Sequence, residues 1–342
     1  MLRSVANVLF IAGMCALSTA FSGEPMITDP LLSYTRPWCI GRFVFDRPAA
    51  SEISNQRYEY RGERIETTPG SSIDEYRAKV AALRSELSLK QRFNPGTNSS
   101  TDHSWLEKEF SPTENSSAFI FRQFDAASPL DFKTEGFILE GGNIFHTHGG
   151  IGPTALSRVE SIYADTYRRV KARDNWTIPT GAGLCIDGGF VSGHSTYTEE
   201  VSQSLALMPG RPALLVIQMR DSIEQDQNEP LTKTLPNLRA RLNRLPGHYR
   251  ILREGKRTIA GMNAEEVLFE IKDGEITSYR FYLLAPGDPR TLAKPHTAIQ
   301  LLLGASSPDL TPEQATSPVD EAGALQVWDT LLNSLRLRPG AV

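Results

Sequence analysis

The sequence predicts an α+β fold made of two tandem α+β domains, each an antiparallel sheet covered by helices. Short runs rich in β-branched and aromatic residues, separated by turn residues, indicate strands along most of the chain. A few longer segments repeat apolar residues every three or four positions, which is typical of amphipathic helices. The chain has 342 residues, and one hydrophobic core rarely organises more than roughly 250 to 300. Two domains are therefore expected.

The first domain is expected over residues 36–178. Its opening strands are predicted at Trp38–Asp46 and Arg57–Arg61. A helix follows, with Ser72 as its expected N-cap. The apolar positions of this helix, three or four residues apart, are Ile73, Tyr76, Val80, Leu83 and Leu87.

After this helix the apolar repeat stops. Residues 94–102 are polar and contain proline and glycine, which predicts a loop. The segments from His103 to His148 resemble the strands of a meander. A second helix is predicted from Thr154 to about Ala172.

The second domain, expected over residues 182–340, repeats this order. Cys185-Ile186 leads into Phe190-Val191 much as Cys39-Ile40 leads into Phe43-Val44. Two strands, a helix, a meander and a closing helix are predicted at residues 202–207, 213–219, 235–245, 249–284 and 318–335. An old internal duplication would leave this pattern.

The N-terminus predicts export through a membrane. Arg3 provides a positive start, residues 5–17 form an apolar run, and Ser18-Thr19-Ala20 offers small residues for cleavage. The run is shorter than the roughly 20 apolar residues that cross a bilayer. Residues 1–22 are therefore predicted to be a cleavable signal peptide; a buried strand or an uncleaved anchor is the alternative.

The charge balance and the lengths of the apolar runs bear on the class of partner. The formal net charge is -4, and removal of the signal peptide takes away Arg3 and no acidic residue, which leaves -5. A mildly acidic chain without a block of lysine and arginine gives no reason to expect nucleic acid as a partner. Charge or glycine interrupts every later apolar run, so no stable membrane insertion is expected.

Two cysteines remain after removal of the signal peptide, Cys39 and Cys185. An even pair in an exported protein favours a disulfide. Two separate buried thiols are the alternative that the sequence leaves open. If joined, the pair would close a long loop and stabilise the fold by roughly 4 to 5 kcal/mol in the chain-entropy model.

Ser195 is the one candidate nucleophile. Gly193-His194-Ser195 begins like the nucleophile elbow of α/β-hydrolases, but Tyr197 stands where that elbow needs a small residue. No helical pattern follows it either. A polar loop serine is the simpler interpretation, and no catalytic residue is expected.

Metal and cofactor sites are not expected. His146 and His148 would share one face of a strand, but two ligands are too few for a zinc site. Gly255-Lys256 lacks the upstream glycine of a phosphate loop, so Lys256-Arg257 is predicted to be a hairpin tip instead. The acidic pairs Glu199-Glu200 and Glu265-Glu266 are expected to be solvated charges.

Separated blocks of residues do resemble a known family. The blocks, in chain order, are Cys39–Phe43, Cys185–Phe190, Gly255–Met262, Trp328–Asp329 and Ser334–Gly340. They are similar to those of the immunity proteins that bacteria make against type VI secretion lipase effectors of the class-four phospholipase group. The likeness covers most of the mature chain.

The resemblance implies a periplasmic protein of two α+β domains that clasps its cognate phospholipase effector, blocks substrate access and holds the lid region of the lipase. It implies no catalysis and no cofactor. Because the shared blocks are structural in character, no effector-binding residue carries over from them. An exported serine hydrolase using Ser195 and His148 is the alternative, and a non-catalytic envelope binding protein is a third interpretation.

Two loops are candidates for contact with a partner, because surface loops carry much of the recognition in binding proteins. Residues 94–102 are polar and rich in small residues, and residues 221–234 are acidic. Ordinary solvated loops are the alternative at both places.

Overall fold

The structure is a computed structural model, which describes residues 30–125, 132–194, 198–228, 230–243 and 248–342. The predicted signal peptide, residues 1–22, and the candidate nucleophile Ser195 lie outside the described residues. Within those described ranges, no helix is long and apolar enough to cross a membrane.

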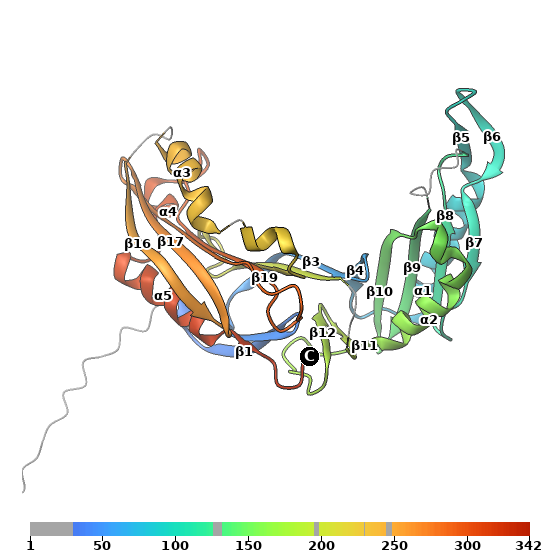
Figure 1. Ribbon diagram of the computed structural model, residues 1–342, viewed down its shortest axis with the longest axis horizontal. Helices are drawn as coiled ribbons and strands as arrows, with labels where there is room; N and C mark the ends of the chain where they lie inside the picture. Colours follow the sequence, from blue (N-terminus) through green and yellow to red (C-terminus); the bar gives the residue numbers. More distant parts are fainter. Residues whose placement is uncertain (1–29, 126–131, 195–197, 229, 244–247) are drawn as a thin grey trace, which may run out of the picture.

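One antiparallel sheet of 12 strands runs through the molecule. The sheet bends into an open crescent with two arms (Figure 1). In order across the sheet, its strands are β16 (His248–Ile259), β17 (Met262–Asp273), β18 (Ile276–Ala285), β19 (His296–Leu303), β15 (Ala213–Arg220), β14 (Glu199–Ala206), β3 (Glu52–Tyr60), β4 (Glu63–Thr68), β10 (Asn143–Gly150), β9 (Lys133–Glu140), β8 (Ser116–Phe121) and β7 (Leu106–Phe110).

Smaller sheets and helices cover this sheet. The small sheets contain β1 (Thr35–Ile40), β2 (Phe43–Pro48) and β20 (Arg336–Leu337); β11 (Val170–Ala172), β13 (Gly189–Ser192) and β12 (Gly183–Ile186); and the hairpin of β5 (Gln91–Asn94) and β6 (Ser99–Ser104). The helices are α1 (Ile73–Leu89), α2 (Val159–Arg169), α3 (Leu231–Leu242), α4 (Pro312–Ala315) and α5 (Glu321–Ser334), with 3-10 turns η1 (Pro30–Leu32), η2 (Pro153–Arg158) and η3 (Glu224–Asn228). The fold is therefore α+β, as predicted.

The large sheet joins the two halves of the sequence. β3 of the first half pairs with β14 of the second half, in the register Tyr58↔Val201. β2, also from the first half, pairs with β20 and contacts α5 near the end of the chain. The two halves thus complete each other, and the division of the sequence between residues 178 and 182 stays a prediction.

The helices follow the apolar pattern of their sequences. α1 begins where expected, because Ser72 Oγ accepts a hydrogen bond from the Glu75 amide while the Glu75 carboxylate accepts one from the Ser72 amide. Its buried side chains pack against Phe119 and Phe137 of the sheet. On the same face of the other arm, α3 places Leu235 against Phe269. α2 and α5 cover the opposite face.

Two segments differ from the sequence prediction. Residues 94–102 are not a simple loop but mostly belong to the β5–β6 hairpin. The side chains of β6 are largely exposed, so the apolar alternation that marks a half-buried strand is absent there. The hairpin tip expected at Lys256-Arg257 lies at Ala260-Gly261, where φ angles of +47° and +76° provide the backbone that a tight two-residue turn needs.

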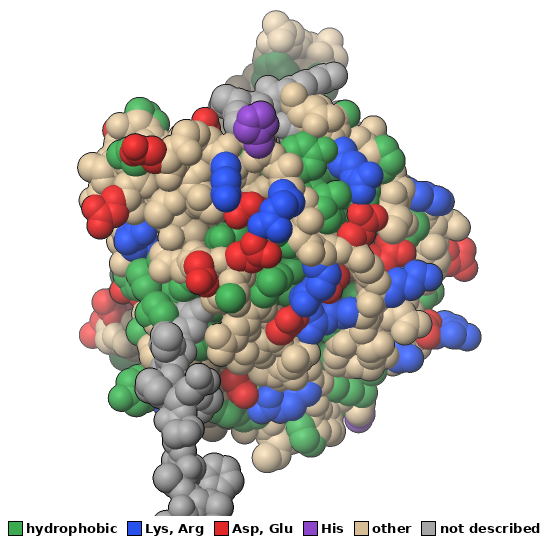
Figure 2. All heavy atoms as spheres, turned by 90° about the vertical axis from the view of Figure 1, so that its left-hand side faces the viewer, with side chains coloured by type: hydrophobic (Ala, Val, Ile, Leu, Met, Phe, Trp, Pro, Cys, Tyr) green, Lys and Arg blue, Asp and Glu red, His purple; other side chains and the backbone are tan. Residues whose placement is uncertain are grey.

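β16 forms one edge of the large sheet and carries many charged side chains. Figure 2 shows that acidic and basic groups are interspersed over this end of the molecule. Charges along an edge strand hinder pairing with the strands of other molecules. This edge is therefore built against aggregation, which makes it a poor candidate for adding a partner's strand.

A disulfide links the two halves beneath the large sheet. The Sγ atoms of Cys39 in β1 and Cys185 in β12 are 2.04 Å apart, and their Cα atoms are 6.0 Å apart. The bond closes a span of 146 residues. Both residues are buried, in the region where β1 and β12 meet.

Replacement of Cys39 and Cys185 by serine is expected to lower the free energy of unfolding by roughly 4 to 5 kcal/mol, because the unfolded chain regains the entropy of a long open loop. Urea unfolding of the oxidised mature protein and of the double variant measures the difference. Reduced wild-type protein should match the double variant, and equal stability of the oxidised wild type and the variant would contradict the prediction.

A candidate partner-binding face and the junction beneath it

The central strands of the crescent leave one face uncovered. Along β14, β15 and β19 every second side chain is buried, and the side chains between them are partly or fully exposed. Tyr282 of β18 packs against the cluster around α3, and α3 lies on the concave side of the crescent (Figure 1). Gln300 of β19 is the register partner of Tyr282, so its side chain points to the same side. The exposed side chains of β14, β15 and β19 therefore lie on the concave side. We call this surface the open face. Its central side chains are Ser202, Ser204, Val216, Gln218, Ala298 and Gln300.

The centre of the open face is neutral, and short side chains lie on both sides of Gln218. Gln218 has Ser202 and Ala298 as its direct neighbours across the strands. Short side chains allow another protein surface to approach closely, and uncharged ones cost less to remove from water than charged ones. This composition suits the middle of a protein interface.

Charged side chains lie toward the arm that contains α1. Arg57 pairs with Glu59 at 2.9 Å, and Arg64 pairs with Glu66 at 3.0 Å. These pairs are accessible to solvent, so each contributes about 1 kcal/mol or less to folding. Their more important effect is to give this end of the open face a charge pattern that a partner can recognise.

The two histidines of β10 share one face of the strand, as their spacing predicted. His146 Nε2 lies 2.9 Å from Glu135 Oε1 on β9, and the His146 ring stacks on Phe137 with centroids 4.8 Å apart. Burial, and then the neighbouring His146, lower the pKa of His148. Glu66 of β4 stands opposite His146 in the strand register. The sequence prediction missed Glu66 because only the pairing of β4 with β10 brings it here.

The remaining candidates for catalysis are not assembled into a site among the described residues. Ser195 lies outside the described residues. His148 lies next to His146 and Glu66. The prediction that Glu199 and Glu266 are solvated charges is wrong. Each is buried in an ion pair, because neighbouring residues of a strand point to opposite faces and these two face the core.

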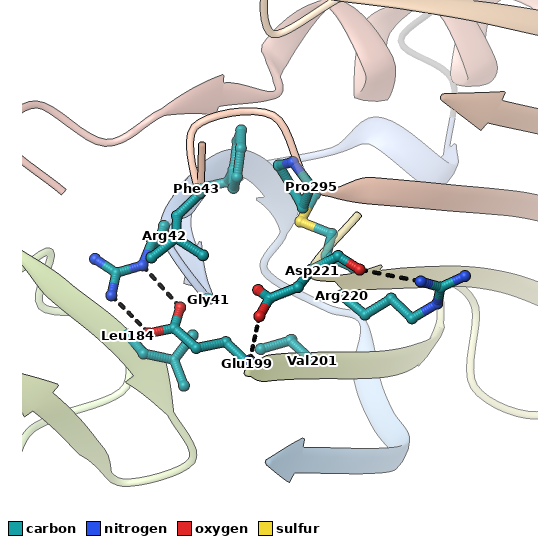
Figure 3. A pocket seen from close by; sticks show the side chains of 11 residues that line it. Gly41, Arg42, Phe43, Leu184, Glu199, Val201, Arg220, Asp221 and Pro295 are labelled. Carbon is teal, nitrogen blue, oxygen red and sulfur yellow. Dashed lines mark hydrogen bonds and ion pairs between the residues drawn. The ribbon is translucent and has the colours of Figure 1, made fainter. Parts of the chain in front are cut away.

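A buried ion pair lies under the open face (Figure 3). The guanidinium of Arg42, just before β2, donates to both carboxylate oxygens of Glu199 in β14, at 2.7 and 2.6 Å. The two side chains are only 3% and 6% exposed. Arg42 also donates to the backbone carbonyl of Ala341. A bidentate pair with a further acceptor satisfies most donors of the guanidinium, which a buried charge requires.

Asp221 lies beside this pair and lines the same small cavity of about 30 Å³, which has room for one or two waters (Figure 3). Its carboxylate accepts a hydrogen bond from the Glu199 amide at 3.2 Å. Burial, and then the charge of Glu199, raise the pKa of Asp221 to about 6. The cavity is too small for an organic substrate.

The end of the chain completes the junction. Arg338 is 1% exposed and donates to the carbonyls of Pro179 and Gly183 at 2.8 and 2.7 Å. Burial, and then the charge of Arg42, lower the pKa of Arg338 to about 10. The backbone amide of Arg338 donates to the Arg42 carbonyl at 3.0 Å. Three of the sequence blocks that resemble a known family therefore meet at this junction, and their role there is structural. They are Cys39–Phe43, Cys185–Phe190 and Ser334–Gly340.

The two segments predicted as partner contacts lie on different arms. Residues 94–102 belong to the hairpin at the tip of one arm (Figure 1). Residues 221–234 include η3 and the start of α3, on the concave side of the other arm (Figure 1). Ile223 in that segment is 48% exposed, and it is one of several large apolar side chains exposed on this molecule.

Replacement of Glu199 by Gln is expected to lower the free energy of unfolding by about 3 to 5 kcal/mol, because it leaves the Arg42 guanidinium buried without a counter-charge. Urea unfolding measures the loss. Glu200→Gln, one residue along on the open face, is the matched control and should change stability by about 0.5 kcal/mol or less. Equal effects of the two changes would refute the assigned role of Glu199.

The stability difference between Asp221→Asn and the wild type is expected to depend on pH in a defined way. The folded carboxyl has a pKa of about 6, above its ordinary value of 3.8, so its proton stabilises the fold below about pH 4, and this stabilisation is lost as pH rises through 6. The variant should therefore be the more stable protein at pH 8, by about 1 kcal/mol after allowance for solvent screening. The advantage should vanish at pH 4 in urea unfolding, and a difference independent of pH would contradict the assignment.

Comparison with known proteins identifies the family. The N-terminal domain model of Tle cognate immunity protein 4 matches residues 36–154, and the C-terminal domain model matches residues 177–340. Together the two models span most of the chain. No curated protein matches it significantly.

Three solved structures share the fold. The apo structure of the immunity protein TplEi of T6SS from Pseudomonas aeruginosa is 21% identical and covers 90% of this chain and 98% of its own, with a TM-score of 0.75. A chain of the Tle4-Tli4 complex has the same identity and coverage, with a TM-score of 0.77. TplEi complexed with the "L" peptide gives 21% identity, coverage of 90% and 99%, and a TM-score of 0.72. With both domain models matched in order, the chain belongs to the Tle cognate immunity protein 4 family.

Proposed function

We propose that this chain is a periplasmic immunity protein that binds a toxic type VI secretion phospholipase effector, clasps it between the two arms of the crescent, and blocks access of substrate. The match of both family domain models to one chain carries this proposal. The protein acts by stoichiometric binding, without catalysis and without a cofactor.

The shape of the molecule supports the clasp. The open face lies between an arm that carries α1 and an arm that carries α3 (Figure 1). A partner seated there would meet neutral side chains at the centre and charged ones such as Arg57 and Glu59 to one side. An interface on the order of 2,000 Å² or more would allow tight binding with slow dissociation, which an inhibitor of a toxic enzyme needs.

The related Tle4-Tli4 complex supports the choice of partner, since its name joins an immunity protein of this fold with a Tle protein. Export by the predicted signal peptide, residues 1–22, would bring this chain to the compartment where a phospholipase meets its lipid substrate. The same compartment is oxidising, which suits the disulfide between Cys39 and Cys185.

Protection of cells tests the proposal. Bacteria that direct the cognate phospholipase to the periplasm should survive when they also produce the full chain, and should die when residues 1–22 are deleted. Gln218→Arg places a charged side chain at the centre of the open face, so it should weaken binding to the lipase at least about tenfold and reduce protection.

Gln326→Arg is the matched control, because Gln326 is exposed on α5, on the opposite side of the sheet. It should change the dissociation constant by about twofold or less, measured by surface plasmon resonance. Ser195→Ala should leave protection intact, and loss of protection by that variant would favour a hydrolase instead. Equal binding by the Gln218 and Gln326 variants would exclude the open face as the interface.

A further inference from the structure

Four side chains on three neighbouring strands meet at one end of the open face. Glu66 of β4 and His146 and His148 of β10 each offer one ligand atom, and these three atoms lie within 4.8 Å of one another. Glu135 of β9 joins the group through its contact with His146 Nε2 at 2.9 Å. Two imidazoles and one carboxylate are a donor set that zinc uses in proteins.

The contact with Glu135 determines which nitrogen of His146 is free. A neutral imidazole carries one N–H, and a carboxylate can only accept it, so Nε2 donates to Glu135 and Nδ1 is left without a proton. Nδ1 is the atom that faces Glu66, 4.0 Å from its Oε2. Histidines that bind metals commonly have their second nitrogen held by a carboxylate in this way.

The three ligand atoms are somewhat farther apart than they would be around a bound zinc ion. Zinc bonds of 2.0 to 2.1 Å place tetrahedral ligand atoms roughly 3.4 Å apart, so the three atoms must draw together modestly. Glu66 is exposed, and the two histidines are only partly buried, which leaves room for side-chain rotation. Glu66 Oε1 pairs with Arg64 at 3.0 Å, so Oε2, which faces His146 Nδ1, is the carboxylate oxygen available to the ion. Phe137 stacks on one side of the His146 ring and restricts its rotation.

We propose that Glu66, His146 and His148 bind one Zn²⁺ ion, with Glu135 as the positioning residue of His146. Three protein ligands leave a fourth coordination position, which solvent fills in the free protein. The site is independent of the proposed immunity function, because it needs only residues of this chain. It revises the sequence prediction of no metal, which counted two ligands and had no means of finding the third.

Isothermal titration of the untagged mature protein with Zn²⁺ alone at pH 7.5 tests the site. The wild type should bind one equivalent. Glu66→Gln and His148→Ala should each weaken binding at least about tenfold, and Glu135→Gln should weaken it by about tenfold through the orientation of His146. With Co²⁺ in place of Zn²⁺, Glu135→Gln should also change the visible absorption spectrum of the bound ion, which a purely structural role would not do.

His103→Ala is the matched control. His103 Nδ1 lies 3.0 Å from Asp125 Oδ2, so it is another histidine paired with a carboxylate, but outside this group. Its removal should leave zinc affinity unchanged. Circular dichroism without metal checks the fold of each variant, and Glu66→Gln, at an exposed residue, provides the test should His148→Ala unfold. Absence of stoichiometric zinc in the wild type, or unchanged affinity in Glu66→Gln, overturns the proposal.

Discussion

The buried ion pair between Arg42 and Glu199 is the interaction on which the rest of this structure depends. Arg42 belongs to the β1–β2 layer, Glu199 belongs to the large sheet, and the carbonyl of Ala341 brings the end of the chain to the same guanidinium. Two charges out of water are tolerated only when nearly every donor and acceptor is satisfied. The layers must therefore meet in one arrangement, and the nearby disulfide holds the same arrangement by a covalent bond.

Much of the local structure could be predicted from the sequence, whereas the joining of the halves could not. Helix α1 follows from its apolar spacing and from the cap at Ser72, both of which are local signals. The pairing of β3 with β14 has no such signal, because it brings together strands far apart in the chain. The polar hairpin over residues 94–102 was missed for another reason: exposed strands lack apolar alternation.

The absence of a local signal for long-range packing also explains why the burial of Glu199 was not predicted. Glu199 and Glu200 look equivalent in the sequence, yet one is buried against Arg42 and the other lies on the open face. Which face is covered depends on elements that pack from elsewhere in the chain. The open face itself has no motif, since its residues are ordinary serine, glutamine and alanine side chains. A surface of this kind can differ between relatives without any loss of the junction beneath it.

The continuity of the large sheet also determines how the molecule can move. Among the described residues, the arms are joined by continuous sheet and not by a linker, because β14 and β3 are hydrogen-bonded neighbours in the middle of the crescent. The distance between the arms is therefore set by sheet curvature, and the molecule is preorganised for its partner. Association then loses little conformational entropy to the closing of a hinge, so more of the contact energy appears as affinity.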